Sequence, residues 1–108
     1  MLIDFSTLDE SVIKNLYGGE NYTHAFMFAD ENNRIMHGKL TPGASIGLHK
    51  HETGSEIVFI LQGKGKAIFD DTEEALHSGV CHYCPKGHAH SIINNGHEDL
   101  IFYAVVTM

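Results

Sequence analysis

Short apolar segments alternate with turn signals along most of this sequence, from Thr23 onward. Glycine, proline, asparagine and aspartate separate the segments, as at Pro42-Gly43 and Asp70-Asp71. Segments of this length and spacing are typical of strands in an all-β sandwich or barrel. Because the chain has 108 residues, we expect a single all-β domain over residues 23–108. The apolar segments cover residues 26–28, 34–40, 56–61, 66–69, 80–84, 90–93 and 100–106.

Residues 1–22 follow a different pattern, and we interpret them as a lead-in segment. Side chains that can cap a helix N-terminus occur at Ser6, Thr7 and Asp9. A glycine pair follows that would end the helix, Gly18-Gly19. The sequence therefore predicts a short helix before the barrel, with its apolar residues at Val12, Ile13 and Leu16.

Two segments are apolar at every position, whereas a half-buried strand alternates apolar and polar residues. They run from Ile57 to Leu61 and from Leu100 to Val106. Continuously apolar strands indicate that both faces are covered, and a barrel of this size has little chain left to cover its outside. We therefore expect a homodimer that packs sheet against sheet, with the N-terminal segment as an alternative cover.

The charge of the chain excludes two classes of partner. There are 14 acidic residues against 7 lysines and arginines, which gives a formal net charge of −7. Such a surface repels phosphate backbones and anionic lipids, so we expect neither nucleic acid nor a membrane as partner. The N-terminus lacks the features of a signal peptide, so a cytoplasmic location is expected. The acidic residues within 70–74 are interpreted as a solvated turn.

The two cysteines, Cys81 and Cys84, form a Cys-x-x-Cys within a predicted strand. On a strand these positions point to opposite faces, so a redox pair is disfavoured. A structural zinc site would need a second pair, which the sequence lacks. We therefore expect two unrelated buried thiols. Cys84 should share its face with His82, and Cys81 should share its face with Tyr83.

Histidine is the unusual entry in the composition, with 9 copies, and two of them form His49-Lys50-His51. On a strand, residues i and i+2 share a face, so both imidazoles point the same way. Two neutral imidazoles begin a site for zinc, iron, manganese, nickel or copper. The alternative for an isolated His-x-His is an ordinary exposed pair.

Glu56 and His90 strengthen the metal interpretation. Glu56 begins an apolar strand, where an unpaired carboxylate would be costly to bury. His90 begins another strand, just after the turn at Pro85-Lys86-Gly87. Three imidazoles and one carboxylate leave positions open for water or substrate, which is typical of catalytic rather than structural metal sites.

The spacing of these residues resembles the two motifs of the cupin family. The first motif is a glycine, five residues, His-x-His, three or four residues, a glutamate, six residues and a glycine. The second is a glycine, five residues, Pro-x-Gly, two residues, a histidine, three residues and an asparagine. Every defining position is matched, first by Gly43, His49, His51, Glu56 and Gly63, then by Gly79, Pro85, Gly87, His90 and Asn94.

The resemblance implies a fold and assigns roles to the matched residues. A cupin is a double-stranded β-helix, a jelly roll of two facing sheets. By this resemblance one divalent transition metal, iron, manganese, nickel or zinc, is bound by His49, His51, Glu56 and His90. The motif glycines and Pro85 would serve turns, and Asn94 would stabilise a turn rather than bind the metal.

The resemblance leaves the activity open. Our first hypothesis is a metal-dependent enzyme acting on a small organic molecule, as a dioxygenase, isomerase, lyase or decarboxylase. The alternative is a non-catalytic module that binds or senses a sugar or another metabolite. A storage role is disfavoured because the complete ligand set is retained.

Two more side chains are candidates beside the ligands. His88 is a candidate general acid or base, or otherwise a residue of the rim. Tyr103 is a candidate donor to a bound anion, or otherwise a buried tyrosine with a satisfied hydroxyl. Val58 and Ile60 should share the face of Glu56 and form an apolar pocket wall. Four histidines without motif context are interpreted as surface or structural residues: His24, His37, His77 and His97.

Overall fold

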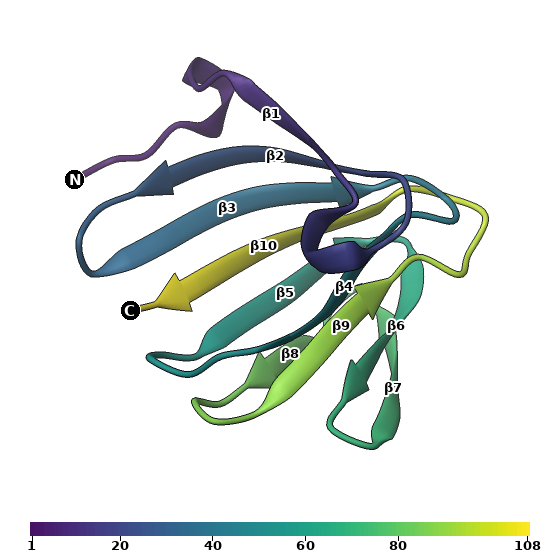
Figure 1. Ribbon diagram of the computed structural model, residues 1–108. Coiled ribbons are helices and arrows are strands. Elements are labelled where there is room, and N and C mark those ends of the chain that lie inside the picture. Colours follow the sequence, from purple (N-terminus) through teal and green to yellow (C-terminus); the bar gives the residue numbers. More distant parts are fainter.

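The computed structural model describes all residues, 1–108, as two antiparallel sheets that face each other (Figure 1). One sheet has six strands in the order β1-β2-β3-β10-β5-β8, and the other has four in the order β4-β9-β6-β7. This arrangement confirms the predicted jelly-roll barrel. In chain order the elements are η1 Phe5–Thr7, β1 Glu10–Lys14, η2 Leu16–Gly18, β2 Tyr22–Ala29, β3 Asn33–Leu40, β4 Ser45–Lys50, β5 Glu56–Gln62, β6 Lys64–Phe69, β7 Thr72–His77, β8 Cys81–Cys84, β9 Ala89–Ile93 and β10 Leu100–Thr107.

The core lies between the sheets and is built from alternate residues of the strands. On β10, Leu100, Phe102 and Ala104 face inward and are almost fully buried. They meet inward residues of the other strands, such as Leu40 and Ile92. Burial of a side chain the size of leucine or phenylalanine stabilises the fold by about 1.5–3 kcal/mol. The core is therefore made of the alternate residues that each apolar strand turns inward.

The N-terminal segment differs from the prediction. No helix runs through Val12 and Ile13, because residues Glu10–Lys14 form β1 and pair with β2, Val12 lying opposite His24. The predicted helix was wrong because β-branched residues suit a strand and the neighbouring β2 supplies backbone partners. The helical lead-in is reduced to two 3₁₀ helices, η1 and η2. The division into residues 1–22 and 23–108 stays a prediction.

The acidic stretch near residue 70 is only partly a turn. Asp70 and Asp71 lie in the turn between β6 and β7, as expected, and Asp70 has a positive φ of 49°. Glu73 and Glu74 lie instead on β7, the edge strand of the four-stranded sheet. Successive strand residues face opposite sides, so these two glutamates have different surroundings.

The turns predicted from the motifs are present. Gly43, Gly63, Gly79 and Gly87 all have positive φ angles, which glycine adopts without strain. The buried side chain of Asn94 donates from Nδ2 to the carbonyl oxygens of Leu40 at 2.7 Å and Glu98 at 2.8 Å. Asn94 therefore ties together the turn before β10, as predicted, and takes no part in the histidine cluster.

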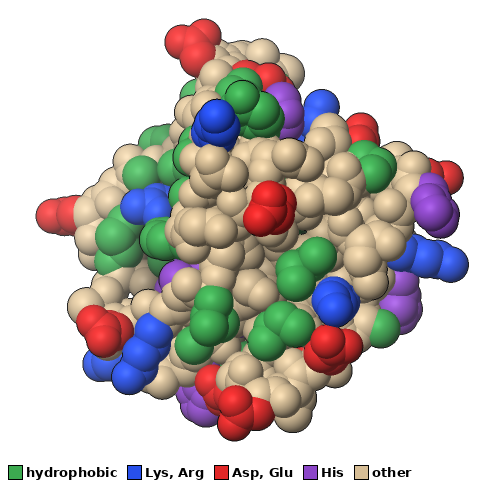
Figure 2. Space-filling view, turned by 45° about the vertical axis from the view of Figure 1, so that its right-hand side comes forward, with side chains coloured by type: hydrophobic (Ala, Val, Ile, Leu, Met, Phe, Trp, Pro, Cys, Tyr) green, Lys and Arg blue, Asp and Glu red, His purple; other side chains and the backbone are tan.

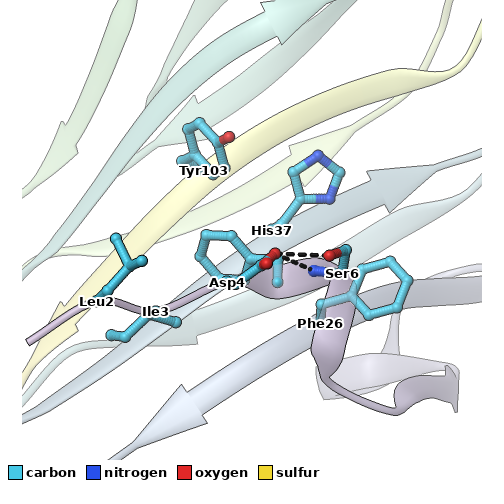
Figure 3. Close-up of a pocket in the computed structure, with 8 residues that line it drawn as sticks. Leu2, Ile3, Asp4, Ser6, Phe26, His37 and Tyr103 are labelled. Carbon is cyan, nitrogen blue, oxygen red and sulfur yellow. Dashed lines mark hydrogen bonds between the residues drawn. The ribbon is translucent and has the colours of Figure 1, made fainter.

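The outer face of the six-stranded sheet is only partly covered by the chain itself. Phe5 of the N-terminal segment stacks on Tyr103 with ring centroids 5.6 Å apart, and the ring of His37 lies edge-on to Tyr103. Together with Phe26 and Leu2 these side chains surround an open pocket of about 640 Å³ on the outside of the barrel (Figure 3). The N-terminal segment thus covers one part of the apolar strands and leaves another part exposed.

The face of the molecule seen in Figure 2 carries mixed charge. On the face shown in Figure 2, lysine and arginine side chains are scattered among acidic ones rather than gathered in one patch. The structure contains no helix with the length and apolar character needed to cross a membrane.

The two cysteines lie on opposite faces of β8, as predicted, but the expectation that both are buried was wrong for Cys81, whose face of this edge strand is open to solvent. The two thiols should therefore differ in reactivity. Cys81 is exposed and Cys84 is buried, and both are free thiols. Burial, and then the nearby negative charges of Glu56, Asp70 and Glu74, raise the pKa of the Cys84 thiol to about 11. Because the thiolate is the nucleophile, iodoacetamide at about pH 8.5 should modify Cys81 and spare Cys84 in the folded protein. Peptide mass spectrometry checks this, and equal labelling of both cysteines would contradict it.

Candidate metal centre

The four predicted ligands come together between the two sheets. His49 on β4 and His90 on β9 are direct partners across neighbouring strands. His51 follows β4 directly, and Glu56 begins β5 of the opposite sheet. The candidate ligand atoms of all four residues lie within 4.8 Å of one another. The structure therefore assembles a cluster of three histidines and one glutamate that could hold a metal ion.

A bulge in β4 turns the histidines inward. Ile46 is buried, and simple alternation would send Leu48 inward and His49 outward. The register against β9 shifts between Ile46 and His49, so Leu48 is 63% exposed and His49 faces the interior. A Cβ on Gly47 would lie only 2.1 Å from the carbonyl oxygen of Tyr17. Glycine is therefore required where η2 packs on the bulge.

The turn before β9 holds the backbone of His51. The N–H of His51 donates to the carbonyl oxygen of His88 at 3.0 Å, and the N–H of Gly87 donates to the carbonyl oxygen of His51 at 2.6 Å. The N–H of His88 donates to the carbonyl oxygen of Pro85 at 3.1 Å and closes the turn. The Pro-x-Gly turn thus positions two candidate ligands, His90, which follows the turn, and His51, whose backbone pairs with it.

The spacing within the cluster fits a metal ion. Nε2 of His90 lies 2.7 Å from Oε1 of Glu56, 3.0 Å from Nε2 of His51 and 3.1 Å from Nε2 of His49. Two ligand atoms at right angles, each about 2.1 Å from an ion, stand about 3 Å apart. Imidazole nitrogens combined with one carboxylate oxygen suit zinc, iron, nickel or manganese. Both the distances and the donor types therefore fit a divalent transition metal.

The outer ring nitrogens of two ligands are already occupied. Nδ1 of His49 lies 2.8 Å from the carbonyl oxygen of Gly47, to which it donates. Nδ1 of His90 lies 2.9 Å from Nε2 of His82 on β8. A neutral imidazole that carries its proton on Nδ1 presents a lone pair on Nε2, the atom that faces the cluster. These contacts leave Nε2 of His49 and His90 facing the cluster, as the binding of a metal ion there would require.

Burial and hydrogen bonding set the charges of the cluster. Burial alone would raise the pKa of Glu56, but hydrogen bonds from the three histidines prevail and hold its pKa well below the usual range. The side chain of His90 is fully buried, and burial lowers its pKa despite the neighbouring Glu56. The side chain of His49 is 12% exposed. Burial lowers the pKa of His49, but the negative Glu56 and the hydrogen bond to the Gly47 carbonyl outweigh burial and raise this pKa. Near neutral pH an ionised carboxylate thus faces a neutral His90, as metal binding requires.

The cluster opens into a cavity of about 290 Å³ between the sheets. His49, His51 and Glu56 line it. Val58 and Ile60 face inward with Glu56, as predicted, but they belong to the closed core. The apolar side chains that line the cavity include Met27, Met36 and Ile46. The predicted apolar wall is therefore present but comes from other strands.

Tyr17 is a cavity residue that sequence reasoning missed. Its ring stacks on His49 with centroids 4.1 Å apart and planes 16° apart. It lies in η2 with a left-handed backbone, φ 51°, and η2 packs against β4. The segment before residue 23 was interpreted as a lead-in, and no local pattern indicates that it reaches the site.

Arg34 on β3 is a second missed residue, and it is the only arginine of the chain. It takes part in none of the salt bridges of the structure. Val106 on β10 is the direct partner of Arg34 on one side and of Glu56 on the other. Neighbouring strands lie about 4.8 Å apart, so the backbones of Arg34 and Glu56 stand about 10 Å apart across the cavity side of the sheet. Arg34, which has no salt-bridge partner, therefore lines the same cavity as the cluster of histidines and glutamate.

The other candidates lie elsewhere. The ring of His88 is half exposed; its Nδ1 donates to Asp70 at 2.7 Å, the ring stacks on Phe69, and it does not line the cavity. Its role as a general acid or base stays a prediction.

Tyr103 is exposed on the outer face of β10 rather than buried, and it lines the outer pocket of Figure 3. Tyr103 therefore cannot donate to an anion bound at the metal cluster.

Comparisons with known proteins agree with this geometry. A family model described as a cupin domain matches residues 36–106. A protein named oxalate-binding protein from Thermotoga maritima is 33% identical over 100% of this chain and 94% of its own length. An uncharacterized protein from Methanocaldococcus jannaschii is 28% identical over 89% of this chain and 72% of its own.

Solved structures show the same fold. The crystal structure of a predicted oxalate decarboxylase from Thermotoga maritima has a TM-score of 0.93 and 31% identity, covering 100% of this chain and 99% of that one. The structure of KdgF from Halomonas sp. has a TM-score of 0.82, covering 99% and 94%, at 15% identity, which shows the fold alone.

The cluster predicts a defined result for the loss of one ligand. His51→Ala should lose most of the bound metal and keep the folded barrel, because the core between the sheets does not include His51. Elemental analysis of protein purified without a histidine tag or chelator measures the metal, and circular dichroism measures the fold. His97→Ala, which removes an exposed histidine outside the cluster, is the matched control. An unfolded His51→Ala protein would show that the metal is structural.

Proposed function

The chain belongs to the cupin family, and from this premise we propose that it binds a small carboxylate of the oxalate class at a protein-bound divalent metal. The proposed metal ligands are His49, His51, Glu56 and His90. The observation that carries the ligand class is the unpaired guanidinium of Arg34 in the same cavity as these ligands. The oxalate-binding relative and the crystal structure of a predicted oxalate decarboxylase, both from Thermotoga maritima, support the same class.

The charges around the cavity favour an anion with two negative charges. A divalent ion held by one carboxylate, Glu56, leaves one positive charge in excess, and Arg34 adds a second. A guanidinium offers a planar fork of donors that matches a carboxylate in a bidentate way. A dicarboxylate would satisfy both charges, one end at the metal and the other at Arg34.

When bound, the metal ion would polarise a carboxylate oxygen as a Lewis acid. The residues of the chain bind and enclose the ligand. Arg34 orients its second carboxylate, while Met27 and Met36 exclude water from the cavity. Tyr17, stacked on His49, limits the space beside the cluster.

Decarboxylation of the same ligand is the second candidate, favoured by the name of the similar crystal structure. Cleavage of the carbon–carbon bond of oxalate releases carbon dioxide, and the remaining carbon must take up a proton to become formate. The carboxylate and imidazoles that line the cavity all belong to the cluster, which leaves Tyr17 and Lys50 as side chains that could move this proton. Because no side-chain carboxylate or imidazole outside the cluster lines the cavity, we place binding before the enzymatic role favoured by the sequence.

Location and assembly complete the proposal. The free thiols of Cys81 and Cys84 suit a reducing compartment, which supports the cytoplasm as the place of action.

For assembly we propose a homodimer formed by the outer face of β10, β5 and β8. Phe59 and Tyr103 are direct partners on this face and both are exposed, as is Tyr83 on β8. Adjacent exposed aromatic side chains on a sheet are typical of a protein interface.

Arg34→Gln should weaken oxalate binding to the metal-loaded protein by about tenfold or more, because a hydrogen bond to a charged group contributes about 1.5–3 kcal/mol. Isothermal titration calorimetry with Mn²⁺-loaded protein measures the dissociation constant. Lys39→Gln is the matched control, since Lys39 lies on the same strand with the opposite facing and loses the same charge. An equal loss in both variants, or no oxalate binding by the loaded wild type, would overturn the ligand class.

Carbon-13 oxalate separates binding from turnover in the same samples. Formate that accumulates with the metal-loaded wild type, but not with His51→Ala, would place the decarboxylase first. Oxalate that binds and persists unchanged supports the binding role.

The proposed dimer predicts a mass by light scattering of twice the 12.0 kDa of the chain. Phe59→Glu should give a monomer, because it places a charge in the centre of the buried face. Leu48→Glu should leave the dimer intact, since Leu48 is even more exposed than Phe59 but lies on the other sheet. A wild-type protein with the mass of one chain would show that the outer face has no second copy on it.

A further inference from the structure

Three side chains form a hydrogen-bonded row from the surface to the metal cluster. Oε1 of Glu74 on β7 lies 2.7 Å from Nδ1 of His82 on β8. Nε2 of His82 lies 2.9 Å from Nδ1 of His90. The other ring nitrogen of His90 belongs to the cluster. The Glu74–His82–His90 row therefore links a surface carboxylate to a proposed metal ligand.

The barrel topology creates this row. β7 is the edge of the four-stranded sheet and β8 is the edge of the six-stranded sheet. Glu74 shares the inward face of β7 with the buried Leu76, whereas Glu73 has the opposite facing and pairs with Lys66 at 3.1 Å. The contact between Glu74 and His82 thus crosses from one sheet edge to the other, which no local sequence pattern indicates.

The middle of the row is shielded from water. The side chains of His82 and His90 are 0% exposed, while that of Glu74 is 45% exposed. The rings of His82 and His90 stack with centroids 5.1 Å apart and planes 15° apart. Both ring nitrogens of His82 have a partner within the row. Because water cannot supply a substitute, the protons of the two rings must be shared within the row.

Metal binding allows one arrangement of these protons. Nε2 of His90 must offer its lone pair to a metal, so the proton of the neutral ring lies on Nδ1. That N–H then donates to Nε2 of His82, which must be an acceptor. The proton of His82 therefore lies on its own Nδ1 and is donated to the carboxylate of Glu74. Every donor in this arrangement has one acceptor.

We infer that Glu74 and His82 are positioning residues that hold His90 in its metal-binding form and strengthen its Nε2 as a ligand. The inference rests on the proposed metal site and extends it to two residues outside the cluster. Groups that orient a ligating histidine in this way typically contribute about 10–100-fold to metal affinity. The carboxylate of Glu74 thus raises the metal affinity of a cluster that it does not touch.

One substitution separates this role from a purely structural one. A Glu74 that only joined the sheet edges would affect stability and leave metal affinity unchanged. Glu74→Gln keeps an oxygen that accepts from the N–H of His82 but removes the negative charge. Glu73→Gln is the matched control, because it removes the same charge from the adjacent residue on the opposite face.

The test is a titration of metal-free wild type and both variants with Co²⁺ against a chromophoric chelator, at fixed pH and ionic strength. Thermal unfolding of the metal-free proteins is measured in parallel. The Co²⁺ dissociation constant of Glu74→Gln should rise about tenfold, and that of Glu73→Gln should stay within about twofold of wild type. The unfolding midpoint of metal-free Glu74→Gln should stay close to that of wild type, since the hydrogen bond is retained.

The outcomes separate the inference from its premise. A Glu74→Gln protein that binds Co²⁺ as tightly as wild type would overturn the inference. An equal loss in Glu73→Gln would also overturn it, because the effect would then be long-range charge rather than the row. A wild-type protein that binds no Co²⁺ would overturn the proposed metal site itself.

Discussion

The buried carboxylate of Glu56 is the constraint on which the rest of the structure depends. An ionised carboxylate inside a barrel is costly unless donors surround it. Glu56 belongs to the six-stranded sheet, while its partners His49 and His90 belong to the four-stranded sheet. The sheets must therefore close on each other at this end of the barrel, and β4 must carry the bulge beside Gly47 that turns His49 inward. The site and the closure of the fold are specified by the same side chains.

Much of this was accessible from sequence because the signals are local. The apolar segments and the turns between them predicted the strands from β2 to β10, apart from β4 and β7. The spacing of His49, His51, Glu56 and His90 predicted the cluster, since residues i and i+2 share a face and a Pro-x-Gly turn sets the start of β9. The period of two also predicted the opposite faces of Cys81 and Cys84.

The rest depends on pairing between distant segments, which a local pattern does not encode. Residues 10–14 are a strand because β2 lies beside them, whereas the local pattern of caps and glycines had predicted a helix. Arg34 lines the cavity because the register of β3 against β10 places it opposite Val106, which lies opposite Glu56 on the other side. Glu74 reaches His82 only because two edge strands of different sheets meet. In each case the decisive information is tertiary.

The proposed dianionic ligand must be reconciled with a chain of formal net charge −7. Screening limits the repulsion, because the Debye length is about 8 Å at physiological ionic strength and Glu56 is the one acidic side chain that lines the cavity. Inside the cavity the guanidinium of Arg34 and a bound ion would act at contact distance, where solvent screens them less. The acidic surface therefore acts on the rate at which anions arrive, and the cavity determines how tightly they are held.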